Sequence, residues 1–179
     1  MSRDQVRRAL HRDLITIDYR PAATSDDLIA GLNDLRPHVV HFSGHAGDAA
    51  LLFDNGSVEA PEGREVPYRL LARALGATDV PPVLVVLNGC DTLAGADVLL
   101  ESTAVIVATA SSISDLAASV FAAKFYAAIA AAQTIGAALD QASVSVDLAG
   151  LDEGWKLDVL ARADVDTAQR PLVQVPGHD

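Results

Sequence analysis

The sequence is poor in cysteine and in aromatic residues. It has one cysteine, Cys90, which excludes an internal disulfide. Aromatic side chains make up only 4% of the 179 residues, so Ala, Val, Leu and Ile must build the core. Half of the residues are hydrophobic, which excludes an intrinsically disordered chain. A chain of this length predicts a single domain over residues 1–179.

Basic residues are also scarce. There are 13 Lys and Arg against 24 Asp and Glu, which gives a formal net charge of -11. This balance argues against nucleic acid and against an anionic membrane surface as partners, because both need a basic footprint. The one basic cluster comprises Arg3, Arg7, Arg8 and Arg12, and its spacing is typical of a solvated helix face.

The sequence has no long apolar segment of the kind that targets or anchors a protein. Its first residues, "MSRDQVRRALHRDL", contain no apolar core of a signal peptide. One Ala-rich stretch, residues 116–132, approaches the length needed to span a membrane. It contains Lys124, so it is interpreted as a buried helix. The cytoplasm is therefore the expected compartment.

Helix and strand signals alternate along the chain. Strands are expected at Leu14–Arg20, His38–Ser43, Val83–Leu87, Ala104–Ala110 and Lys156–Ala163, with a hairpin around Asn55-Gly56. Helices are expected at residues 3–12, after a capping box at Thr24 and Asp27, from Pro67 to Gly76, at Gly95–Glu101, and after caps at Ser114 and Thr134. This order predicts an α/β fold with a mostly parallel sheet covered on both faces.

Two apolar strands end in a glycine followed by a reactive side chain. "VVHFSGHAGD" (39–48) presents His45, and "LVVLNGCDT" (84–92) presents Cys90. Chemistry in open α/β sheets gathers beyond the carboxyl ends of the strands. Neighbouring strands are about 4.8 Å apart. Adjacent strands would therefore bring imidazole and thiol together, and the imidazole would then activate the thiol as a nucleophile.

Three alternatives involve the same residues. Each of His45 and Cys90, taken alone, is often structural. A metal site drawn from His41, His45, Cys90 and Asp48 is weakly supported, because their spacing is loose; His41 is better interpreted as a hydrogen-bonded histidine within the sheet. A phosphate loop at "SGHAGD" needs a helix straight after it, and a hairpin is expected instead.

The two motifs resemble those of the CHAT domain family, which is caspase-like. "HVVHFSGHAG" is similar to the family's His motif and "VVLNGCDT" to its Cys motif, and the Ala-rich "FAAKFYAAIAAAQTIGAAL" resembles its long helix. The resemblance implies a three-layer αβα sandwich and a cysteine endopeptidase that needs no cofactor or metal. It makes Cys90 the nucleophile and His45 the general base and acid, with the backbone N–H groups of Ala46 and Cys90 as oxyanion donors.

The resemblance also suggests substrate contacts. The residue two before the nucleophile lines the specificity pocket in such enzymes; here it is Asn88, which is neutral and does not indicate cleavage after a basic residue. Asp91, Asp115 or Asp48 would supply an acid from the surrounding loops, and Ser111 and Ser112 would line the rim.

The chain departs from the family at two places. Ala46 stands where relatives usually have Gly, and the usual first strand before the first helix is missing. The exposed edge that this leaves suggests an activating protein partner or a homodimer. The resemblance implies an effector in a bacterial signalling or defence system. The rival function is a catalytically silent scaffold or partner-binding module.

Overall fold

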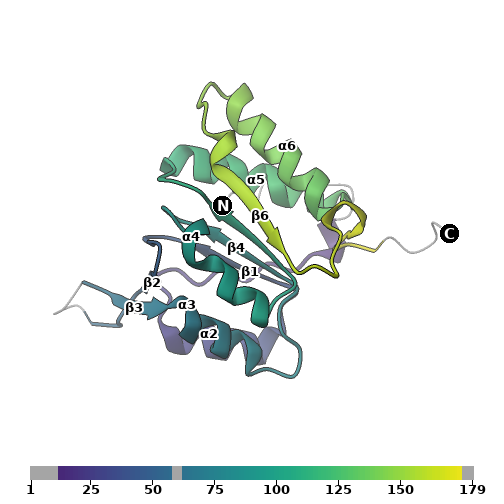
Figure 1. Cartoon of the computed structure of the whole chain (residues 1–179). Helices are drawn as coiled ribbons and strands as arrows, with labels where there is room; N and C mark the ends of the chain where they lie inside the picture. Colours follow the sequence, from purple (N-terminus) through teal and green to yellow (C-terminus); the bar gives the residue numbers. More distant parts are fainter. Residues whose placement is uncertain (1–11, 58–61, 175–179) are drawn as a thin grey trace. The chain divides into compact units, whose positions relative to one another are not determined.

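The computed structural model describes residues 12–57 and 62–174 (Figure 1). These residues form two compact units. The sheet unit comprises the described residues of Asp18–Ser112 together with Asp158–Arg162. The helical unit comprises the described residues before Asp18, Ile113–Leu157, and the described residues from Ala163 on. A single domain over 1–179 stays a prediction from the sequence.

A four-stranded sheet forms the centre of the sheet unit. Its order is β1-β4-β5-β6, with β1 at Val39–Ser43, β4 at Leu84–Asn88, β5 at Val105–Thr109 and β6 at Leu157–Ala161. β4 is parallel to both β1 and β5. β6 is antiparallel to β5. The evidence is that the N–H of Arg162, just after the end of β6, donates to the carbonyl of Ala104, just before the start of β5 (3.0 Å). The predicted α/β fold with a mostly parallel sheet is confirmed.

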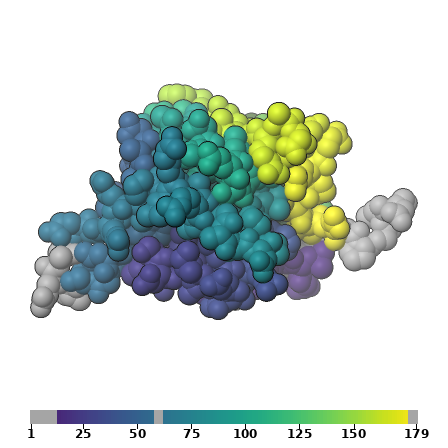
Figure 2. Space-filling model, turned by 60° about the horizontal axis from the view of Figure 1, so that its bottom comes forward, coloured from purple at the N-terminus to yellow at the C-terminus, as the bar shows by residue number. Residues whose placement is uncertain are grey.

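Helices flank this sheet in the sheet unit. α2 (Ser25–Leu35) and α3 (Tyr68–Gly76) lie side by side in Figure 1, and their purple and blue surfaces adjoin in Figure 2. The buried side chains of Leu32 on α2 and Leu75 on α3 share a hydrophobic core with Val85, Leu87 and Ile106 on the strands. α4 (Leu93–Ala96) and the 3-10 helix η2 (Asp97–Glu101) follow β4. Every residue of β4 and β5 is buried, as their continuous apolar runs predict.

The predicted helix starts are confirmed. Thr24 caps α2 in a capping box, in which its hydroxyl accepts from the N–H of Asp27 and the Asp27 carboxylate accepts from the N–H of Thr24. Ser114 caps α5 (Asp115–Ala130), and Thr134 caps α6 (Ile135–Leu148). These side-chain oxygens satisfy backbone N–H groups that the first helical turn leaves open.

The strand predicted at Leu14–Arg20 is wrong. Residues 12–14 form the 3-10 helix η1 (Arg12–Leu14), and residues 15–20 belong to no helix or strand. Ile15 and Ile17 are half-buried and alternate with exposed Thr16 and Asp18, so the pattern is present. Alternation describes one chain, whereas a strand needs a hydrogen-bonded neighbour. The structure describes no strand between Arg12 and β1. The helix expected at 3–12 lies almost wholly outside the described residues, and the missing first strand before it stays a prediction.

The hairpin after the His motif is confirmed, but its second strand lies further along the chain than expected. β2 (Ala50–Phe53) pairs with β3 (Arg64–Pro67), which places Leu51 opposite Val66. Gly56 adopts a left-handed conformation (φ 70°), and the Asp54 carboxylate accepts from its N–H (2.6 Å). The Asn55-Gly56 turn is therefore part of a long connection, which includes residues 58–61 outside the described structure.

A shallow groove lies on the surface between α2, α3 and η2. Its lining includes Ile29 on α2, Leu70 on α3, and Glu101 and Ser102 at the end of η2. Ser102 directly precedes the segment that leads into β5, so the groove opens toward the amino end of that strand. It therefore lies away from the strand ends that carry His45 and Cys90.

The helical unit is built on α5 and α6, which pack along one another. The rings of Phe121 and Phe125 stack at 5.4 Å, and Tyr126 meets Phe125 edge-on. Within the described part of the chain, no helix has the combination of length and apolar character that crossing a bilayer requires.

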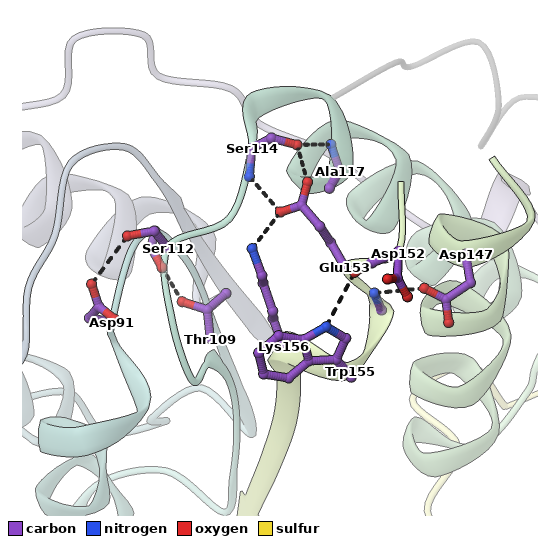
Figure 3. Close-up of polar contacts among 12 residues, drawn as sticks. Asp91, Thr109, Ser112, Ser114, Ala117, Asp147, Asp152, Glu153, Trp155 and Lys156 are labelled. Carbon is purple, nitrogen blue, oxygen red and sulfur yellow. Dashed lines mark hydrogen bonds and ion pairs between the residues drawn. The ribbon is translucent and has the colours of Figure 1, made fainter. Parts of the chain in front are cut away.

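Glu153 ties the loop after α6 to the start of α5 within this unit (Figure 3). Its carboxylate accepts hydrogen bonds from the N–H and the hydroxyl of Ser114 (2.9 and 2.6 Å) and from the ammonium group of Lys156 (2.9 Å). These hydrogen bonds lower the pKa of Glu153 from its ordinary 4.5 to about 2. The Glu153 side chain is 14% exposed, whereas Ser114, its partner in two of the three bonds, is exposed.

We therefore expect Glu153→Gln to lower the free energy of unfolding relative to the natural chain, and to lower it more at neutral pH than at acid pH. The folded-state pKa is below the unfolded value, so the ionised group stabilises the fold above about pH 4.5, and this contribution is lost as pH falls toward 2. Losing charge-assisted hydrogen bonds costs about 1–2 kcal/mol at pH 7. Urea unfolding of both proteins at pH 7, 5 and 3 measures this difference. Exposed Glu101→Gln is the control; equal effects of the two substitutions would contradict the prediction.

Candidate active site

The carboxyl ends of β1 and β4 lie beside each other. The parallel register pairs Val39 with Leu84 and Ser43 with Asn88, so both strands end at the same level. Gly89 then approaches the chain that leaves β1: a Cβ added to it would lie 2.7 Å from the carbonyl oxygen of Gly44 and 2.9 Å from the Cβ of Ala46. The segments that carry His45 and Cys90 are therefore in backbone contact.

The hairpin holds the segment that carries His45. The His45 carbonyl accepts from the N–H of Leu52 (3.0 Å), and the N–H of Gly47 donates to the carbonyl of Ala50 (3.1 Å). Both hydrogen bonds join backbone groups, so they hold the main chain at this position. The imidazole of His45 stays exposed. An exposed side chain on a hydrogen-bonded backbone is available to a substrate without losing its position.

Tyr68 fixes the same segment from α3. Its hydroxyl donates to the carbonyl of Gly47 (2.7 Å), and its N–H donates to the carbonyl of Ala49 (3.2 Å). Burial, with the nearby Asp48 carboxylate, raises the pKa of Tyr68 to about 12, so the hydroxyl remains a donor throughout the neutral range. Gly95 leaves room for the ring, since a Cβ there would lie 2.8 Å from it.

The backbone of Ala46 faces away from the hairpin. Ala46 pairs with Leu51 in an antiparallel bridge. The two hydrogen bonds of this bridge are made by neighbouring residues: Gly47 donates to Ala50, and Leu52 donates to His45. In such a pair, the N–H and C=O of the bridging residue itself point outward, away from the partner strand. The N–H of Ala46 therefore points away from β2 and is not used in the pairing with Leu51.

Cys90 lies in a tight turn directly after β4. It is a free thiol and half-buried. Asp91 follows in a left-handed conformation (φ 55°), which turns the chain sharply after the cysteine. The hydroxyl of Ser112, on the loop after β5, donates to the Asp91 carboxylate at 3.4 Å (Figure 3). Asp91 is thus held by the neighbouring loop.

Two buried threonines support this turn. The hydroxyl of Thr109, at the end of β5, donates to the carbonyl of Gly89. The Thr92 hydroxyl accepts from the N–H of Thr109 (3.0 Å) and lies 3.1 Å from the carbonyl of Leu87. Both threonines are fully buried.

Neither threonine was predicted from the sequence to have a role at this site. The available signal was position: Thr109 is the polar end of an otherwise apolar strand, and Thr92 follows the cysteine by two residues. A polar group in such a place needs a buried partner. The sequence could not show that the partner would be the backbone beside Cys90.

The remaining predicted residues lie at different places. Asn88 is buried and is the last residue of β4. Ser111 is half-buried, and its hydroxyl oxygen is enclosed with no hydrogen-bond partner among the described residues. Asp48 is exposed on the His segment. Asp115 is the exposed first residue of α5 and belongs to the helical unit.

His41 is part of the sheet. It lies in the middle of β1, opposite Val86, and burial lowers its pKa to about 4, so it is neutral at pH 7. Across residues 12–57 and 62–174, no three His, Cys, Asp or Glu side chains come together in an arrangement that could hold a metal ion.

Comparison with protein families matches residues 3–151 to the CHAT domain. The chain belongs to the CHAT domain family. CHAT domains are caspase-like peptidases as a family, which agrees with the α/β sheet and with the His and Cys segments at its carboxyl edge. The match ends at residue 151, before β6. Comparison with curated proteins finds no significant match.

Proposed function

We propose that this CHAT domain is a cysteine endopeptidase with a His45/Cys90 dyad. The observation that carries the proposal is the contact of Gly89 with Gly44 and Ala46, because it joins the segments that present the two side chains. The half-buried thiol and the exposed imidazole are both open to a peptide. The family match adds support, since the family is caspase-like.

In the proposed reaction, His45 takes the thiol proton and the Cys90 Sγ attacks the carbonyl carbon of the scissile peptide. The negative charge that forms on the carbonyl oxygen is stabilised by the N–H groups of Ala46 and Cys90. The C–N bond then breaks, and the protonated His45 gives its proton to the leaving amine. Water activated by His45 hydrolyses the thioester and restores the thiol.

Substrate contacts are proposed on the loops beside Cys90. Asn88 and Asp91 flank the nucleophile in the sequence, whereas Ser111 stays a prediction from the sequence, because its hydroxyl oxygen is enclosed. A neutral Asn88 favours a side chain other than Lys or Arg before the cleaved bond. Asp115 stays a prediction from the sequence.

Mapping of new protein N-termini tests the proposed function. The purified protein is added to an extract of bacterial cytoplasm, the proposed compartment, and N-termini are compared with those produced by Cys90→Ser. We expect new N-termini that appear only with the natural chain and that share residues before the cut. His45→Ala should abolish the same set, because the dyad acts as a unit.

Identical N-termini with the natural chain and with Cys90→Ser would overturn the peptidase proposal and favour the scaffold function.

We propose that the natural role is an effector in bacterial signalling or defence. A protein partner or a second copy would activate it at β1, which is the outer strand of the sheet in the described structure. The extract is therefore used unfractionated, so that an activator present in it can act.

A further inference from the structure

The carbonyl of Gly89 points into the protein interior. It accepts the hydrogen bond from the Thr109 hydroxyl, which is fully buried at the end of β5. Gly89 is itself buried, whereas Cys90, the next residue, is half-buried. The Gly89–Cys90 peptide group thus has its oxygen on the inner side and leads to a residue that is partly exposed.

The direction of this carbonyl also sets the direction of the Cys90 N–H. A trans peptide group is planar, and its C=O and N–H point in opposite directions. No cis peptide bond occurs among residues 12–57 and 62–174. Because Thr109 holds the oxygen inward, the Cys90 N–H is turned away from the buried threonine, toward the side where an oxyanion would form.

Thr92 completes the arrangement. Its hydroxyl donates to the Leu87 carbonyl (3.1 Å), and its oxygen lies 3.2 Å from the Thr109 hydroxyl. It also accepts the N–H of Thr109, which places the Thr109 hydroxyl beneath Gly89. Thr92 therefore holds the residue whose hydroxyl binds the Gly89 carbonyl.

We propose that Thr109, supported by Thr92, is a positioning residue that aims the Cys90 N–H as an oxyanion donor. The inference rests on the proposed peptidase function and adds a role for two residues outside the dyad. It predicts that Thr109 affects only reactions that build an oxyanion. Alkylation of the thiol by iodoacetamide builds none, whereas acylation by the small ester p-nitrophenyl acetate does.

The test compares both reactions in Thr109→Val, which keeps the shape and removes the hydroxyl. Because valine leaves the Gly89 carbonyl without its donor, the peptide group is free to rotate. We expect ester acylation to fall about tenfold or more, since loss of an oxyanion donor costs about a hundredfold or more, while alkylation changes by less than about twofold. Thr109→Ser restores the hydroxyl and should recover most of the ester rate.

Thr103→Val is the matched control. Thr103 is equally buried and lies just before the start of β5. Its hydroxyl also donates to a backbone carbonyl, that of Pro82. Cysteine-selective 15N labelling gives a second readout, because the single cysteine produces a single backbone amide signal. We expect Thr109→Val to shift that signal, and Thr103→Val to leave the signal and both rates unchanged.

The outcomes separate the two proposals. If Thr109→Val keeps the natural ratio of acylation to alkylation, or if Thr103→Val lowers that ratio as much, the positioning role is overturned while the dyad stands. If the natural chain shows no acylation above Cys90→Ser, the peptidase proposal fails, and the positioning role falls with it.

Discussion

At pH 6, Cys90 in the natural chain is expected to react with iodoacetamide at least about tenfold faster than in His45→Ala. An ordinary thiol ionises near pH 8.5, so well under 1% is thiolate at pH 6. An imidazolium beside the sulfur stabilises the thiolate and raises this fraction. With one cysteine in the chain, the increase in mass of the intact protein measures the rate directly.

His38→Ala is the control for this experiment. His38 is exposed and directly precedes β1, so it lies at the opposite end of the strand that leads to His45. We expect its replacement to leave the alkylation rate near that of the natural chain. If the two histidine variants react alike at every pH from 5 to 9, the imidazole of His45 does not meet the thiol, and the proposed dyad is wrong.

Gly89→Ala is expected to separate the two segments of the site. The added Cβ would lie 2.7 Å from a backbone oxygen and 2.9 Å from a Cβ, neither of which can rotate away. One strand end must then shift. Overpacking of this kind costs about 1–3 kcal/mol in the free energy of unfolding. We expect the alkylation rate at pH 6 to fall at least about tenfold, toward that of an isolated thiol.

Gly47→Ala is a control within the same site. An added Cβ at Gly47 meets nothing within 4 Å, although the residue lies two positions after His45. Its effect on unfolding should stay within about 0.5 kcal/mol, with alkylation unchanged. A Gly89→Ala protein that retains both natural stability and natural alkylation would show that the contact between the two segments is not needed for the dyad.

The parts of the fold that the sequence predicted are those with strong local signals. β4 and β5 are continuous apolar runs, and a run of this kind is typical of a strand that is covered on both faces. Thr24, Ser114 and Thr134 predicted helix starts because the capping hydrogen bond forms within four residues. The positions of His45 and Cys90 at two strand ends followed from the same runs.

The errors and omissions depend on residues that are distant in sequence. Residues 15–20 have the alternation of a strand, but no local signal shows whether a neighbour will pair with them. The hairpin partner Arg64–Pro67 was missed because Asn55-Gly56 predicted a shorter connection. Thr92 and Thr109 meet only when β4 and β5 are side by side, so their hydrogen bonds could not be inferred from either segment alone.

The parallel pairing of β1 with β4 has a consequence for biosynthesis. Parallel strands require a long crossover, and such distant pairings form late because the loop must close before any contact stabilises it. The His and Cys segments therefore stay apart in a chain whose sheet is incomplete. Under the proposed peptidase function, a nascent or partly unfolded chain would carry the thiol without its imidazole and would be inactive until the sheet is complete.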